Sequence, residues 1–163
     1  HLVLSTIHTN SAAGAVSRFM GLSIERQILA NTLECAIGQR LVRKLCPYCE
    51  KEEVVLDDDS LNKVKESLKM IKNPKFTMPE ELKFYRSKGC PECNNIGYKG
   101  QIGLYEILEM NKAISEAIMN KDISDQEIEK IAVDNGMITM LQDGILKALA
   151  GLTSIEEVFR TTK

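Results

Sequence analysis

Two matching clusters of cysteines, Cys46-Pro47-Tyr48-Cys49 and Cys90-Pro91-Glu92-Cys93, divide this chain of 163 residues into three parts. Each cluster, called a clip below, carries a Cys-x-x-Cys pair of thiols, and 40 residues (50–89) lie between the clips. A Cys-x-x-Cys turn aims two sulfurs at one point, and two such turns together supply the four thiolates that tetrahedral Zn²⁺ prefers. The clips therefore predict a metal site with four ligands, Cys46, Cys49, Cys90 and Cys93.

The separation of the clips does not weaken this prediction. Simple zinc ribbons leave about 15 to 20 residues between their clips. Because loop-closure entropy grows only logarithmically with length, the longer loop costs well under ~1 kcal/mol more, against the ~10 kcal/mol or more that zinc contributes to metal-dependent peptides. A site closed by four thiolates has no open position for water, so we expect a structural zinc rather than a catalytic one.

Two other uses of the thiols remain open. Four cysteines can also hold an iron–sulfur cluster, although nothing else in the sequence indicates redox chemistry. Cys-Pro-Tyr-Cys alone resembles the active-site motif of glutaredoxins, in which the first thiolate is activated at a helix N-terminus. Residues 50–59 show no amphipathic helical pattern, however, and their acidic excess would raise the pKa of a nearby thiol. A shared zinc ion is the favoured interpretation.

Composition excludes some classes of function. The 21 basic and 23 acidic side chains nearly cancel, giving a net charge of -2, whereas nucleic-acid-binding domains usually carry an excess of Lys and Arg. The sequence has no run of about 18 apolar residues and no signal-peptide pattern, so we expect a cytoplasmic protein. Because His1 stands without a preceding Met directly before an apolar run, we expect a fragment of a longer chain.

Before the first clip, the pattern predicts a strand, two helices and a strand. Residues 2–7 form a continuous apolar and β-branched run, typical of a strand buried on both faces of a parallel sheet. Helices are expected at about 11–19 and 23–37, and the apolar face of the second would include Cys35 as a buried, unreactive thiol. Residues 39–45 predict a strand that runs into the first clip.

Between the clips, residues 50–59 are charged and are not expected to pack, and a helix is predicted where apolar residues repeat from 61 to 71. Pro79 is expected to open a further short helix. After the second clip, residues 101–110 predict a strand that could lie beside the strand leading into the first clip. Capping signals and glycine stops predict four more helices, at about 112–120, 125–135, 138–150 and 154–160.

His1 and His8, the two histidines of the chain, bracket the first predicted strand. In α/β sheets, ligands bind at the carboxyl ends of strands, where a following helix N-terminus offers N–H groups to phosphate. Judged by its position alone, such a histidine more often has a structural role than a functional one. Arg40 and Arg43 are expected to be solvated or paired locally, and contact with a nucleotide or an adjacent subunit is the alternative.

Four segments resemble the secretion-superfamily ATPases, the hexameric motors of type II secretion and type IV pilus assembly. The segment His1-Leu2-Val3-Leu4-Ser5-Thr6-Ile7-His8-Thr9-Asn10 resembles their histidine box. Residues 39–46 resemble the segment that leads into the tetracysteine zinc subdomain of the family, residues 97–106 the segment that leaves it, and residues 151–158 the closing helix. Assembly and export motors share the four cysteines and the retraction-type pilus motor lacks them, so the resemblance favours the former branch.

The resemblance implies an α/β fold: the C-terminal part of a RecA-like P-loop ATPase core, with an inserted tetracysteine zinc subdomain and a C-terminal helical bundle. The corresponding expected domains are a portion of the core (1–45), the zinc subdomain (46–100), a returning core strand (101–110) and a helical subdomain (111–163). His1 and His8 would sense or orient the nucleotide phosphates and the attacking water.

The resemblance also implies ATP hydrolysis with Mg²⁺ in a homo-hexamer. The motor would drive pilin or pseudopilin polymerisation through an inner-membrane platform protein, at the inner face of the bacterial plasma membrane. A phosphate-cradling loop, Gly-x-x-x-x-Gly-Lys-Ser/Thr, is not found in this sequence, so we predict that the chain alone is inactive. The alternative hypothesis is a free-standing zinc-stabilised interaction module, which a phosphate-cradling loop encoded upstream would exclude.

Overall fold

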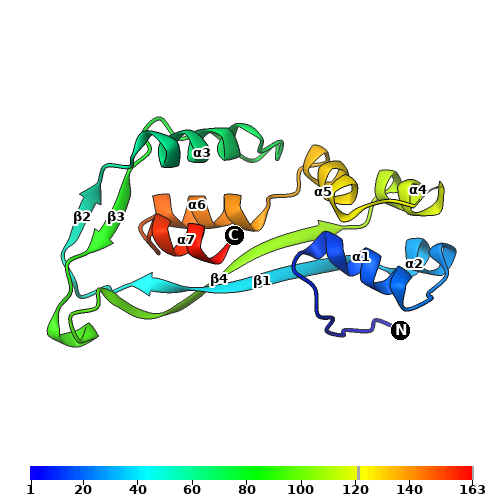
Figure 1. Ribbon diagram of the computed structural model, residues 1–163, viewed down its shortest axis with the longest axis horizontal. Coiled ribbons are helices and arrows are strands. Elements are labelled where there is room, and N and C mark those ends of the chain that lie inside the picture. The colour runs from blue at the N-terminus through cyan, green and yellow to red at the C-terminus, as the bar shows by residue number, and fades with distance from the viewer. Residues whose placement is uncertain (121, 163) are drawn as a thin grey trace.

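A long antiparallel ribbon of two strands carries the two larger hydrophobic cores of the described residues. In the computed structural model, which describes residues 1–120 and 122–162, β1 (Cys35–Leu45) pairs with β4 (Tyr98–Glu109) along nearly its whole length (Figure 1). The register shifts once, after Arg43. The two strands flank the clips in sequence, so their pairing confirms the prediction that these segments are neighbours.

Side chains alternate between the two faces of this ribbon, as the pleat of a strand requires. On the inner face, Val42, Leu104 and Leu108 are at most 1% exposed, whereas Ile37 and Ile107 on the outer face are 61% and 47% exposed. The helices therefore cover the inner face, and the outer face carries exposed apolar side chains.

Each half of the inner face supports one core. The first core gathers around Leu108. Its helices are α1 (Ala12–Gly21), α2 (Arg26–Thr32), α4 (Lys112–Asn120) and α5 (Asp125–Asp134).

The second core gathers around Leu104 and Val42. Its helices are α3 (Asp58–Lys69), α6 (Met140–Leu149) and α7 (Ile155–Thr161). A short antiparallel ribbon, β2 (Lys51–Val54) with β3 (Phe84–Ser87), carries the chain out to α3 and back. Phe84 is 1% exposed and joins the second core.

Local polar signals set the helix starts. The side chain of Ser11 accepts the Gly14 N–H at α1, and Ser124 and Thr139 form capping boxes at α5 and α6. The four helices predicted after residue 111 are confirmed as α4 to α7, with ends within two residues of the expected ones. The helices predicted at 11–19 and 61–71 are confirmed as α1 and α3.

The strand predicted over residues 2–7 is wrong for the described structure. The segment is extended but pairs with no strand of the described residues, and Leu2, Val3 and Leu4 are 78% to 89% exposed. An apolar run becomes a strand only where a neighbouring strand takes its backbone hydrogen bonds. Both described sheets are antiparallel ribbons formed by other segments, so the parallel sheet that we expected is not part of them.

The helix predicted over residues 23–37 is also partly wrong, because α2 covers only Arg26–Thr32 and Cys35 begins β1. Cys35 is exposed, which corrects the expectation of a buried thiol. Ala36 and Ile37 pair with Leu108 and Ile107. These partners lie far along the chain, so helical spacing within residues 23–37 could not reveal them.

Two further corrections concern the excursion between the clips. Part of the charged segment 50–59 forms β2, where Glu52 and Arg86 are opposed across the strands and form an ion pair. No helix follows Pro79, because the chain stays irregular until β3 begins at Phe84. The β2–β3 ribbon is stabilised by charge pairing across the strands and by burial of Phe84. Neither interaction produces a periodic pattern in the local sequence.

Candidate metal centre

The structure brings the four clip thiols to one point. All four sulfur atoms lie within 4.8 Å of one another. The Sγ–Sγ distances are 3.9 Å for Cys46 and Cys90, 3.5 Å for Cys49 and Cys93, and 3.8 Å for Cys90 and Cys93. Four sulfurs held 2.3 Å from one tetrahedral ion would lie about 3.8 Å apart. The arrangement therefore fits a zinc ion without large movement of the backbone.

The two ribbons position the clips at their junction. Strand β1 ends at Leu45, directly before Cys46, and the Cys46 N–H donates to the Gly97 carbonyl oxygen at 2.9 Å. On the other side, the Lys88 N–H donates to the Glu50 carbonyl oxygen at 3.2 Å and continues the β2–β3 pairing toward the clips. Figure 1 shows both clips at the end of the long ribbon where the chain turns toward the short one. Each clip is therefore fixed by strands on both sides.

Left-handed backbone shapes the second clip. Pro91–Cys93 forms a single 3-10 turn, and Asn94, Asn95 and Gly97 follow with φ angles of 51°, 61° and 76°. A Cβ on Gly97 would lie 2.8 Å from the Ser87 carbonyl oxygen, so this position requires glycine on two grounds. The tight turn lets the amides of Cys90 and Gly97 donate to the Cys93 sulfur, each at 3.3 Å.

The site is buried, and its electrostatics differ between the thiols. Cys46, Cys49 and Cys93 are at most 8% exposed. Burial raises the pKa of the Cys49 thiol to about 12, with contacts from the neighbouring thiols acting in the same direction. Burial also opposes ionisation of Cys93, but the amides of Cys90 and Gly97 outweigh it and lower its pKa to about 6. The protein itself thus stabilises the Cys93 thiolate, whereas the Cys49 thiol needs a cation to ionise at neutral pH.

The surroundings of the first clip argue against the glutaredoxin-like alternative. That chemistry needs a helix starting at the first thiol, but Cys49 is followed by β2, which begins at Lys51. The donor set, four thiols with backbone N–H groups aimed at one sulfur, suits a closed tetrathiolate metal site. The structure therefore supports a metal at this position, and the residues that would hold it are Cys46, Cys49, Cys90 and Cys93.

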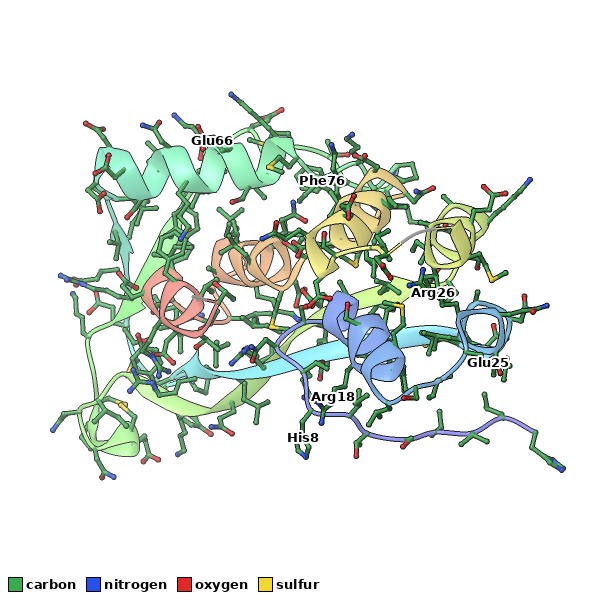
Figure 2. All side chains as sticks on the ribbon, turned by 45° about the vertical axis from the view of Figure 1, so that its right-hand side comes forward. His8, Arg18, Glu25, Arg26, Glu66 and Phe76 are labelled. Carbon is green, nitrogen blue, oxygen red and sulfur yellow. The ribbon has the colours of Figure 1, made fainter. Side chains whose placement is uncertain are left out.

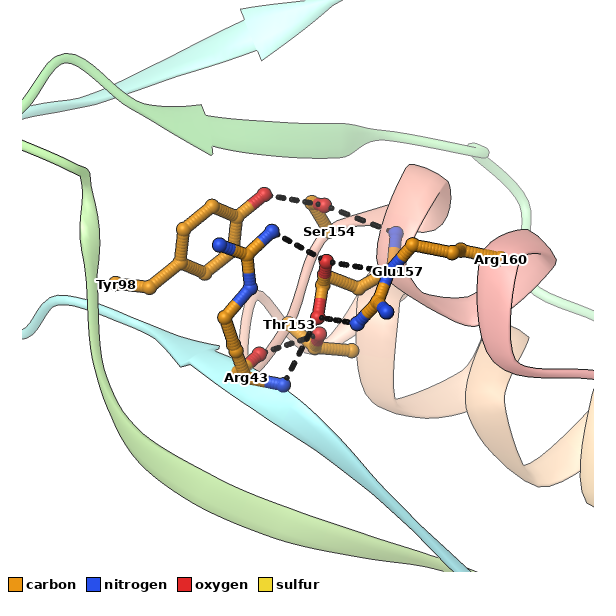
Figure 3. A network of polar contacts seen from close by, with 6 residues as sticks. All are labelled: Arg43, Tyr98, Thr153, Ser154, Glu157 and Arg160. Carbon is orange, nitrogen blue, oxygen red and sulfur yellow. Dashed lines mark hydrogen bonds and ion pairs between the residues drawn. The ribbon is translucent and has the colours of Figure 1, made fainter.

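The end of β1 at Arg43–Leu45 and the start of β4 at Tyr98 lie next to the clips and are called the neck below. A polar network joins this neck to the C-terminal helix α7 (Figure 3). The Arg43 guanidinium donates to Glu157 Oε1 at 2.6 Å and lies 4.2 Å from the centre of the Tyr98 ring. The Tyr98 hydroxyl contacts the Ser154 hydroxyl at 2.8 Å. Arg160 donates to both carboxylate oxygens of Glu157. The expectation of a locally paired Arg43 is thereby confirmed, whereas Arg40 is exposed.

The loop before α7 completes this neck. The Leu45 N–H donates to the Leu152 carbonyl oxygen at 3.0 Å, and the Lys51 ammonium donates to the Gly151 carbonyl oxygen at 2.8 Å. Thr153, fully buried, donates its hydroxyl hydrogen bond to the Arg43 carbonyl oxygen at 2.8 Å. Sequence patterns did not indicate the roles of Lys51 and Thr153, because their partners lie about a hundred residues away along the chain. In α7 the acidic Glu157 is buried beside the apolar Ile155 and Val158, which is the mark of a residue with a polar partner.

The two histidines lie apart from the thiols. Residues 1–9 form an extended segment beside the α1 and α2 end of the ribbon, opposite the clips (Figure 1). His1 and His8 are exposed, and the His8 side chain points away from the helices (Figure 2). Thr9 donates to the Ser11 carbonyl oxygen at 2.9 Å, which shapes the turn into α1. The structure therefore assembles the predicted metal ligands and leaves the predicted nucleotide sensors on an open surface.

Comparison with known proteins identifies the family. A family model described as "Type II/IV secretion system protein" matches residues 1–160. The chain belongs to this family. It is 40% identical over its whole length to the type II secretion system ATPase E of Vibrio cholerae, covering 30% of that protein. It is 37% identical to the type IV pilus assembly ATPase PilB of Pseudomonas aeruginosa, covering 27%, and 36% identical to PilB of Thermus thermophilus, covering 17%.

The chain thus spans under a third of the length of these relatives of the type II/IV secretion family. Within the described residues, no helix has the length and apolar character needed to cross a membrane. The family match over residues 1–160 spans both histidines, the four cysteines and most of α7.

Proposed function

We propose that the full-length protein is an ATP-hydrolysing motor of a type II secretion or type IV pilus assembly system, and that this chain is its C-terminal part. The observation that carries the proposal is the family match over residues 1–160. Relatives that are 35% to 40% identical to the chain are named as type II secretion or type IV pilus assembly ATPases. On this proposal residues 1–45 and the returning strand 101–110 belong to a RecA-like ATPase core, residues 111–163 form a helical subdomain, and the motor works as a homo-hexamer.

Zinc is the proposed resident metal of the four thiols. When bound, it supplies a rigid four-sulfur crosslink and no reaction chemistry. The crosslink would close the neck of the excursion between β1 and β4, so that β2, β3 and α3 move with the long ribbon as one body. Such a handle suits contact with a neighbouring subunit or with an inner-membrane platform protein, which would place the motor at the inner face of the bacterial plasma membrane.

His1 and His8 are the proposed nucleotide-sensing residues of this chain. Their exposure leaves them free to face a nucleotide held by other residues. A phosphate-cradling loop is not found in the sequence given, so ATP and Mg²⁺ would be bound elsewhere in the full-length protein. The chain alone is accordingly expected to lack ATPase activity.

ATP turnover of the full-length protein, compared with that of residues 1–163 alone, tests the proposal. We expect phosphate release from the former and none from the latter. A full-length protein that binds zinc but neither binds nor hydrolyses ATP would overturn the motor proposal in favour of a zinc-stabilised interaction module. Turnover by residues 1–163 alone would contradict the placement of the nucleotide site outside this chain.

A further inference from the structure

A buried carboxylate sits between the two cores. Glu106 lies on the inner face of β4, two residues from Leu104 of the second core and two residues from Leu108 of the first. It is 7% exposed. Among the ion pairs formed by described residues, none includes Glu106. A carboxylate in this position is costly unless hydrogen bonds compensate for its lost hydration.

The compensation comes from the first residues of two helices. Glu106 Oε1 accepts the Ala12 N–H at 2.6 Å, and Oε2 accepts the Met140 N–H at 3.3 Å. Ala12 begins α1 in the first core, and Met140 begins α6 in the second. The first N–H groups of a helix have no partner within the helix, and the helix dipole favours negative charge there. One side chain therefore ties two helix starts that lie in different cores.

The opposite strand leaves room for this arrangement. Gly38 pairs with Glu106 across the ribbon, and a Cβ on Gly38 would lie 2.8 Å from Glu106 Cγ and 3.0 Å from Oε1. The Ala12 nitrogen would lie 3.3 Å from the same Cβ. A side chain at position 38 would thus displace the carboxylate without changing its chemistry.

This arrangement links the histidine segment to the C-terminal helices. Ala12 starts α1 only four residues after His8, whereas α6 shares its core with α7, which is locked to the neck of the clips. We propose that Glu106 is a positioning residue for ATP turnover: it fixes the start of α1, and hence the segment carrying His8, relative to α6. This role rests on the proposed function, because it assumes that the His8 segment faces the nucleotide.

Two variants disturb the hydrogen bonds between Glu106 and the two helix starts in different ways. Glu106→Gln keeps the shape of the side chain but turns an N–H donor toward one of the two helix starts. Gly38→Ala keeps the carboxylate and displaces it. We expect each variant, in the full-length protein, to lower kcat for ATP by roughly tenfold with KM changed less than about twofold, because displacement of a catalytic segment by an ångström lowers the rate without removing nucleotide contacts. Hydrogen exchange at the Ala12 and Met140 amides should accelerate in both variants.

Two control variants separate positioning from loss of stability. Glu109→Gln changes an exposed carboxylate on the same strand, and Asp57→Ala removes the cap of α3, which accepts the Ser60 N–H at 2.9 Å. Neither should lower kcat. The inference is overturned if Glu106→Gln and Gly38→Ala lower kcat no more than Asp57→Ala does, if they raise KM alone, or if kcat falls without faster exchange at Ala12 and Met140. An inactive wild-type protein instead overturns the proposed function and this role with it.

Discussion

Arg43 and Glu157 join β1 to α7 through two contacts at once. The Arg43 backbone N–H donates to Glu157 Oε2 at 3.1 Å, and its guanidinium donates to Oε1 at 2.6 Å. The Glu157 side chain is 3% exposed, whereas that of Arg43 is 48% exposed. The carboxylate is thus buried between a strand and a helix while its cationic partner reaches the surface, so the pair sets the position of α7 against the neck of the clips.

The first prediction concerns acid stability. Arg43, together with Arg160, lowers the pKa of Glu157 to about 2 in spite of its burial. Since the folded-state pKa lies below the unfolded value of about 4.3, Glu157 stabilises the fold above that value, and the contribution is lost as pH falls toward 2. After a discount for the solvent-exposed Arg43, the contribution of Glu157 to the free energy of unfolding is about 2 kcal/mol. Urea unfolding at pH 6 and pH 3 should show Glu157→Gln less stable than wild type at pH 6, with the difference shrinking at pH 3.

Comparing the two proteins at each pH cancels the contribution of metal loss in acid, which affects both. Glu156→Gln is the matched control, because Glu156 is the exposed neighbour in the same turn of α7. Its difference from wild type should stay near zero at both pH values. A difference for Glu157→Gln that is the same at pH 6 and pH 3 would contradict the assigned pKa.

The second prediction concerns the metal. Purified protein should contain about one zinc per chain, because the four thiols match one tetrahedral site. Cys90→Ser should reduce the zinc content. It should also accelerate hydrogen exchange in residues 50–89 far more than in α4 to α6, because residues 50–89 lie between the clips and are anchored by them at both ends. Cys35→Ser is the control, because Cys35 is the exposed fifth cysteine. Zinc-free protein with a readily reducible Cys46–Cys49 bond would refute the metal site.

How much the sequence could predict depends on the range of the interactions. The clips, the capping residues Ser11 and Ser124 and the glycine stops are local signals, and the elements that they predict are present. The errors fall where distant partners decide. Cys35 became part of a strand because β4 pairs with it from 74 residues away, at Glu109. Periodicity in a single window cannot report such a partner.

Glu106 is another feature that sequence patterns could not assign. In the alternation of β4, it occupies an inward position between two leucines, where an apolar residue is the normal expectation. The N–H groups at the starts of α1 and α6, on Ala12 and Met140, explain this position, and their approach to β4 is a property of the tertiary fold. A buried charge inside a strand pattern is therefore a signal of a partner, although it does not identify the partner.

The third prediction separates backbone strain from steric clash at two glycines. Gly97 and Gly100 both have positive φ, 76° and 82°. An added Cβ would meet the Ser87 carbonyl oxygen at 2.8 Å at Gly97, but nothing within 4 Å at Gly100. Gly100→Ala should therefore cost about 1 kcal/mol of unfolding free energy from strain alone, and Gly97→Ala clearly more, about 2 to 3 kcal/mol.

The same pair tests the link between the turn and the metal. Because the Gly97 amide donates to the Cys93 sulfur, Gly97→Ala should also weaken zinc retention against a chelator, whereas Gly100→Ala should not. Equal losses of stability in the two variants would show that the Ser87 contact relaxes without cost.

The fourth prediction is that His8 matters for turnover and not for folding. His8 is exposed and lies on an unpaired extended segment, so His8→Ala should change the unfolding free energy of this chain by no more than about 0.5 kcal/mol. If the proposed function holds, the same substitution in the full-length protein should lower ATP turnover by about tenfold or more, because a polar group aimed at developing charge is worth at least that much. Thr32→Ala is a suitable control, since Thr32 is also exposed and its hydroxyl donates to the Ile28 carbonyl oxygen of its own helix. Normal turnover in His8→Ala, with stability unchanged, would show that the exposed histidine segment does not reach the nucleotide, and it would remove the functional reason for Glu106 to fix the start of α1.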